Sequence, residues 1–168
     1  ANDNNIHERL VLVKNTTKMI KANWALGVGV SNWKIYEPIY GQTSITSNIR
    51  VDYPHNDYLS VFAETGIIGV MCYMLFLFLA IKKAIKIYKH TNERKLKILS
   101  LLMLGGILGF AIVSFFGFAK EKFFPMIFLM MMIAILVSID SKENEDGMRF
   151  RKIVLLLFIP VIILLSVV

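Results

Sequence analysis

The sequence predicts an all-α fold, a polytopic membrane helix bundle preceded by a partly helical segment outside the membrane. Hydrophobic residues make up 56% of the 168 residues and charged residues only 18%, which is too apolar for an ordinary soluble domain. The net charge of +7 comes largely from basic residues beside long apolar runs, as in membrane proteins. We therefore expect membrane lipids as partners and no nucleic acid.

Residues 1–60 are expected to form the outer segment, beginning with an amphipathic helix from Ile6 to about Trp24. Apolar residues recur there at helical spacing, which predicts one buried face made of Ile6, Leu10, Val13, Ile20 and Trp24. Arg9 falls at the edge of this face. Because an unpaired buried charge is costly, we expect Arg9 to have a specific anionic partner, either a carboxylate or a phosphate.

A glycine turn follows this helix. Gly27 and Gly29 are separated by one residue, and glycine permits positive φ and close backbone approach. We expect the turn to end the helix and to expose backbone amides to substrate. It lacks the further glycine and the strand-to-helix context of a dinucleotide site.

The next feature is a histidine at an expected helix start. Pro54 disfavours helix at Tyr53, and Asn56 is a good helix cap, so His55 should meet the positive end of the helix dipole. That position favours the neutral imidazole, which can accept a proton, and it also attracts phosphate. Taken alone, His55 fits a purely structural hydrogen bond near the cap better than a catalytic role.

Glu64 lies nine residues after His55, about half a helical turn out of phase, so the two do not form an obvious hydrogen-bonded pair. A carboxylate at the membrane edge is costly unless it is paired or reached by water. Glu64 is therefore expected either to anchor an arginine, such as Arg9 or Arg50, or to contact substrate.

Residues 61–168 are expected to form the membrane region. The uncharged runs Thr65–Ile81, Ile98–Ala119, Phe123–Ile139 and Ile153–Val168 contain 17, 22, 17 and 16 residues, close to the roughly 20 needed to cross a bilayer. We place the spans at about 61–81, 98–119, 123–139 and 153–168.

The basic loops set the expected orientation. Residues 82–97 hold a strong excess of Lys and Arg, which predicts a cytoplasmic loop. Alternation then places residues 120–122 outside and residues 140–152, which are again basic, inside. Residues 1–60 consequently lie on the extracytoplasmic side.

Small and sulfur-containing residues in the spans are expected to be structural. Gly105 and Gly109 stand four residues apart, a spacing that favours close helix packing. The single Cys72 cannot form a disulfide framework or a cysteine metal cluster. We expect no metal and no cofactor.

One stretch resembles a known family. His55-Asn56-x-Tyr58-Leu59 followed by Glu64-x-Gly66-Ile67-Ile68-Gly69 is similar to the core motif of the O-antigen ligases and polymerases, which are polytopic bacterial membrane proteins. Arg9 and the turn Gly27-Val28-Gly29, with Asn32 and Trp33 after it, also look like that family. The resemblance covers about residues 6–70, and it departs from many members in lacking a proline just before the glycine turn.

The resemblance implies an inverting, metal-independent glycosyl transfer at the outer face of the bacterial inner membrane. The donor would be an undecaprenyl-diphosphate-linked glycan, and the acceptor a hydroxyl of lipid A core, of a glycan chain or of a protein. His55 would be the base and Arg9 would hold the diphosphate. Arg50 is a second candidate clamp without motif support, and the further candidates for substrate binding are Asn56, Glu64, Gly27 and Gly29.

Two alternatives remain at this point. The sequence does not separate a ligase from a polymerase or from a protein-glycosylating relative. A non-catalytic transporter or structural membrane subunit is the other class, although the spans offer no ionisable residue near the membrane midplane, where transporters usually have one. The chain starts at Ala1 without a signal peptide, so we expect it to be the C-terminal part of a longer protein and inactive by itself.

Overall fold

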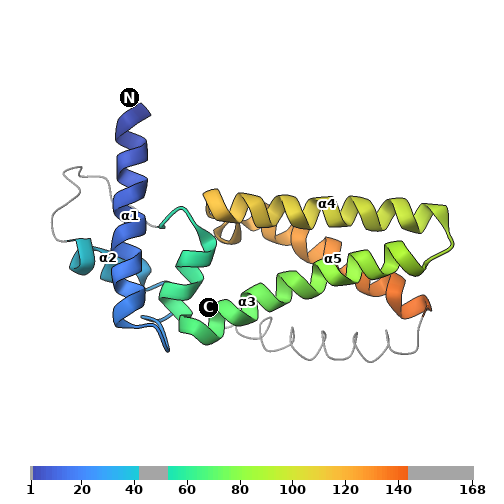
Figure 1. Cartoon of the computed structure of the whole chain (residues 1–168), viewed down its shortest axis with the longest axis horizontal. Coiled ribbons are helices and arrows are strands. Elements are labelled where there is room, and N and C mark those ends of the chain that lie inside the picture. The colour runs from blue at the N-terminus through green and yellow to red at the C-terminus, as the bar shows by residue number, and fades with distance from the viewer. Residues whose placement is uncertain (1, 42–52, 144–168) are drawn as a thin grey trace. The chain divides into compact units, whose positions relative to one another are not determined.

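The computed structural model describes residues 2–41 and 53–143, and within these ranges the chain is helical without strands. The helices are α1 (Asn2–Ala22), α2 (Trp33–Gly41), α3 (Asp57–His90), α4 (Arg94–Phe116), the short 3₁₀ helix η1 (Ala119–Glu121) and α5 (Phe123–Glu143) (Figure 1). The predicted all-α fold class is confirmed.

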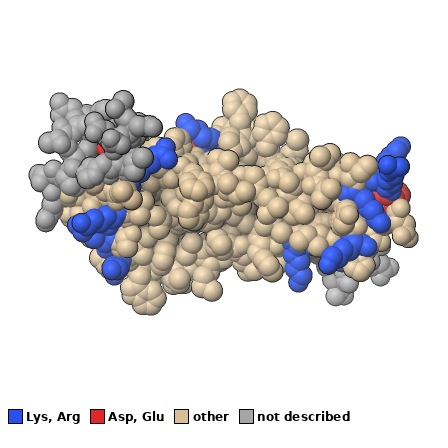
Figure 2. Space-filling model, turned by 45° about the horizontal axis from the view of Figure 1, so that its top comes forward, with Lys and Arg blue, Asp and Glu red and all other residues tan. Residues whose placement is uncertain are grey.

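Helices α3, α4 and α5 are each long and apolar enough to cross a membrane, as the first three predicted spans require. Helix α4 ends at Phe116 instead of the predicted Ala119, because Gly117 follows and glycine is a poor helix former. The fourth predicted span, 153–168, lies outside the described residues. Figure 2 shows a surface dominated by uncharged side chains, as expected for helices that contact lipid.

The chain divides into two compact units, one of residues 1–78 and 109–126, the other of residues 79–108 and 127–168. The first unit contains α1, α2, the beginning of α3, the end of α4, η1 and the first residues of α5. The second unit contains the remaining turns of α3, α4 and α5. Every candidate site residue that the structure describes belongs to the first unit.

The core of the first unit forms where α1 packs against α2 (Figure 1). Trp33 is 1% exposed, and its indole Nε1 donates to Thr16 Oγ1 at 3.0 Å. The amide of Asn15 donates to Glu37 Oε1, also at 3.0 Å. These bonds satisfy polar groups on the inner face of α1, so burying them costs little.

The buried face of α1 is therefore not the predicted one. Leu10, Val13 and Trp24 are exposed and only Ile20 of the expected set is buried; the side chain of Ile6 lies outside the described part of the structure. The residues of α1 that are buried are Leu12, Asn15, Thr16, Met19 and Ile20. Apolar periodicity missed this face because two of its members are polar and find their partners on α2.

In the second unit, α3 and α5 are joined by an ion pair between Lys83 and the buried Asp140, which Lys86 also approaches at 3.5 Å. The close helix contact is made by Gly106, where an added Cβ would overlap the thioether of Met132. Gly105 and Gly109 have no neighbour within 4 Å of an added Cβ, so the predicted packing role of that pair is not found among the residues that the structure describes.

Candidate active site

His55 lies immediately before the cap of α3. Asn56 Oδ1 accepts the Leu59 amide at 3.0 Å, which confirms Asn56 as the helix cap. The backbone of His55 has φ 55°, a left-handed conformation that is uncommon for residues other than glycine. The buried Pro54 on one side and the cap on the other hold this conformation.

The imidazole of His55 is half-buried against an aromatic residue that follows α4. The ring of Phe118 meets it edge-on, with centroids 5.2 Å apart and planes at 62°. Burial lowers the pKa of His55 below 6.5, and the positive charge of Arg9 lowers it further. Both effects disfavour the imidazolium, so the imidazole is neutral near pH 7 and able to accept a proton.

Arg9 lies on α1 with its side chain exposed, and its charge acts on His55. The two residues to which the resemblance assigns the chemistry are thus coupled through charge, although they are 46 positions apart in the sequence. No acidic side chain pairs with Arg9 among the described residues, so the expected carboxylate partner is not found there. Arg50 lies outside the described residues.

The glycine turn docks against a break in α3. Gly66 interrupts the helix with φ 69° and ψ −165°, which frees the carbonyls of Ala63 and Glu64 from their usual helical donors. The amides of Val28 and Gly29 donate to these two carbonyls, each at 2.9 Å.

The backbone of the glycine turn and the backbone of α3 lie in direct contact. The amide of Ile67, also freed by the break, donates to the carbonyl of Trp24 at 2.9 Å. A Cβ at Gly27 would overlap the backbone of Glu64, and one at Gly66 would overlap the backbone of Ala25. Glycine is therefore required at both positions, where φ is also positive.

The turn does not expose its amides as expected. The amide of Gly27 donates to the carbonyl of Asn23 at 2.8 Å, and that of Gly29 donates to Glu64. Both groups are consequently engaged within the chain, where they fix the backbone of the motif. The expectation that these amides are free for a phosphate is corrected.

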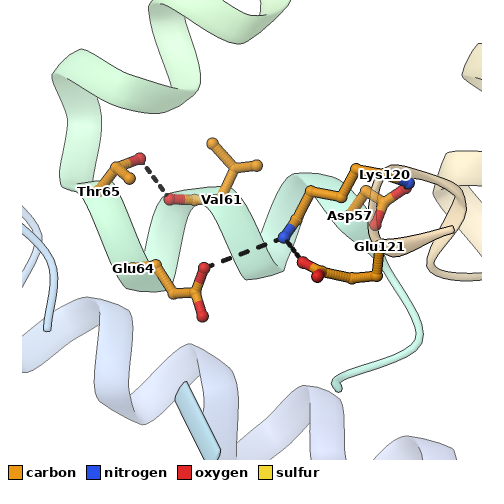
Figure 3. A network of polar contacts seen from close by, with 6 residues as sticks. All are labelled: Asp57, Val61, Glu64, Thr65, Lys120 and Glu121. Carbon is orange, nitrogen blue, oxygen red and sulfur yellow. Dashed lines mark hydrogen bonds and ion pairs between the residues drawn. The ribbon is translucent and has the colours of Figure 1, made fainter. Parts of the chain in front are cut away.

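Glu64 has several partners within the chain, and Arg9, the one predicted arginine that the structure describes, is not among them. Its side chain is buried, and its carboxylate accepts the backbone amides of Ser31 and Trp33 at the start of α2, where the helix dipole favours negative charge. Lys120 Nζ approaches Glu64 Oε2 at 3.9 Å (Figure 3). Glu64 thereby links α3 to α2 and to the connection between α4 and α5.

That connection, residues 117–122, is the part of the site that sequence reasoning missed. The backbone amide of Lys120 donates to Asp57 Oδ2 at 2.9 Å, and its ammonium also pairs with Glu121 (Figure 3). These contacts hold Phe118 beside His55. The sequence predicts only that residues 120–122 form a short loop between two spans. No local pattern singles out Phe118.

Comparison with known proteins found one similar family. Residues 1–74 match the family model described as O-antigen ligase. Searches of curated proteins and of solved structures found no match. The matched range contains Arg9, the glycine turn, His55 and the break at Gly66. Residues 1–74 are therefore similar to the O-antigen ligase family, and the resemblance recognised in the histidine motif is confirmed over this part of the chain.

Proposed function

We propose that this protein is a membrane glycosyltransferase that transfers or polymerises a glycan from an undecaprenyl-diphosphate carrier onto a hydroxyl acceptor. The observation that carries the proposal is the environment of His55, a half-buried imidazole with a lowered pKa directly before an apolar helix. A polyprenyl carrier keeps its chain in the bilayer and its diphosphate at the surface. A base at the end of a membrane helix is therefore at the right level for the reaction.

In the proposed reaction His55 removes the proton of the acceptor hydroxyl while the acceptor oxygen attacks the anomeric carbon. The bond from that carbon to the diphosphate oxygen breaks, and the carrier leaves as a diphosphate with inversion at carbon. General-base assistance of this kind contributes about 10² to 10⁴ in rate. A neutral imidazole suits the step because one of its ring nitrogens has a free lone pair that can accept the proton.

Arg9 is proposed to stabilise the diphosphate as negative charge builds on the leaving oxygen. A guanidinium binds phosphate oxygens through two parallel hydrogen bonds. The exposed side chain of Arg9 is compatible with this role, and its effect on the pKa of His55 supports proximity of the clamp to the base. Preorganised charge of this kind is commonly the largest single contribution to catalysis.

The test is His55→Ala in the full-length protein, with His90→Ala as the matched control. His90 is an exposed histidine at the other end of α3 and has no part in the proposal. We expect His55→Ala to abolish glycan transfer while membrane insertion and abundance stay normal, and His90→Ala to behave as wild type. Unchanged glycan products from His55→Ala would refute His55 as the base.

A further inference from the structure

A stacked aromatic pair lies next to His55 and is not used by the proposed reaction. The rings of Tyr53 and Phe118 have centroids 5.6 Å apart and planes at 24°. Phe118 in turn meets the edge of His55. Tyr53 is 36% exposed, so the pair presents an aromatic surface beside the proposed base.

Contacts within the chain restrain the aromatic pair of Tyr53 and Phe118. Lys122 Nζ lies 4.8 Å from the centroid of the Phe118 ring, a cation–π contact. The preceding Lys120 is bonded through its amide to Asp57, at the first turn of α3. Pro54, which joins Tyr53 to His55, is buried. The orientation of the pair is thus fixed by both chain segments that supply it, and little ordering is required when a ligand binds.

We propose that Tyr53, supported by Phe118, is the binding surface for a pyranose ring of the acceptor. The inference rests on the proposed function and narrows its acceptor to a sugar. One face of a pyranose carries several C–H groups with partial positive charge, which complement the negative face of an aromatic ring. A sugar lying on Tyr53 has its hydroxyl groups at its rim, where one can reach the adjacent imidazole.

The acceptor, and not the donor, is assigned to this surface because His55 must contact the acceptor hydroxyl. A general base must lie within hydrogen-bonding distance of the proton that it removes, and that proton belongs to the acceptor. The donor is held through its diphosphate by a cation, and its lipid chain remains in the membrane. The surface nearest to the base is consequently the place for the acceptor ring.

The experiment measures glycan transfer by the full-length protein in membrane vesicles that contain the natural donor and acceptor. Fusing these vesicles with others that lack either the donor or the acceptor changes the concentration of one substrate at a time. Tyr53→Leu is expected to raise the acceptor KM by roughly 3- to 10-fold, the size of an aromatic contact, and to leave the donor KM unchanged. Tyr53→Phe and Tyr53→Trp keep a ring face and should retain the wild-type acceptor KM.

The matched control is Tyr36→Leu, because Tyr36 on α2 is 37% exposed and takes no part in the proposal. An acceptor KM for Tyr53→Leu equal to that of Tyr36→Leu would overturn the inference, and so would a rise confined to the donor KM. Loss of the wild-type acceptor KM in the Phe and Trp variants as well would identify Tyr53 as merely structural. Continued transfer by His55→Ala would instead refute the proposed function, so the two failures are distinguishable.

Discussion

The contact between the glycine turn and the break in α3 can be tested with Gly66→Ala. A Cβ at this position would overlap the backbone of Ala25, and the residue has φ 69°. Neither problem can be relieved by turning a side chain, because backbone opposes backbone. We therefore expect the substitution to push the turn away from α3 and to destabilise the first unit.

The size of the effect follows from two contributions. An alanine at φ 69° and ψ −165°, a conformation open essentially only to glycine, costs about 1–3 kcal/mol. Moving the turn also breaks the three backbone bonds that join Val28 to Ala63, Gly29 to Glu64 and Ile67 to Trp24, each worth about 0.5–1.5 kcal/mol. The free energy of unfolding should fall by at least about 2.5 kcal/mol, which for chains of this size corresponds to a midpoint lower by roughly 5–10 °C.

Thermal unfolding of the detergent-solubilised protein measures this change, with Gly105→Ala as the matched control. Gly105 is helical and has no heavy atom within 4 Å of an added Cβ. Alanine there should leave the midpoint unchanged or raise it slightly, since alanine is the better helix former. Gly27→Ala should resemble Gly66→Ala, and the double variant should lose less than the sum, because both changes break one contact. A Gly66→Ala protein with the midpoint of the Gly105→Ala control would refute the docked arrangement.

Two further predictions concern charge. Replacing Arg9 by Gln removes a charge that lowers the pKa of His55, so the acidic limb of the pH profile of kcat/KM should move to higher pH. Arg9→Lys keeps the charge and should leave this limb in place, but it should lose turnover because lysine lacks the two parallel donors of the guanidinium. The same acidic limb in both variants would contradict an effect of the Arg9 charge on His55. Replacing Glu64 by Ala leaves the amides of Ser31 and Trp33 without their acceptor and should lower the free energy of unfolding by about 1–3 kcal/mol. Glu64→Gln keeps an acceptor oxygen and should lower it less. An equal loss in both variants, measured by thermal unfolding, would show that Glu64 stabilises the unit through its charge and not through these hydrogen bonds.

The elements that could be predicted from the sequence are those set by local chemistry. Length and apolar content identify α3, α4 and α5 as membrane helices, because the bilayer imposes both requirements on each segment separately. Asn56 was identified as the cap of α3, and the structure confirms it, since capping depends only on the next three residues. His55 is placed at the helix start by the same reasoning.

The features that could not be predicted depend on partners far away in the sequence. The inner face of α1 contains Asn15 and Thr16, which are buried only because Glu37 and Trp33 satisfy them. Glu64 was expected either to anchor an arginine or to contact substrate, but its charge partner among the described residues is Lys120, 56 positions later. Periodicity and spacing report on one segment at a time and contain no information about such pairs.

The break at Gly66 explains why separate sequence signals form one site. A helix interrupted at Gly66 leaves backbone groups that need partners in a region close to the membrane, where unsatisfied groups are costly. The glycine turn supplies those partners, and Glu64, two residues before the break, caps α2 and binds Lys120. Lys120 then fixes the connection that positions Phe118 against His55. A change at the glycine turn should consequently reach the imidazole through Glu64 and Lys120, although no residue of the turn is assigned to the chemistry.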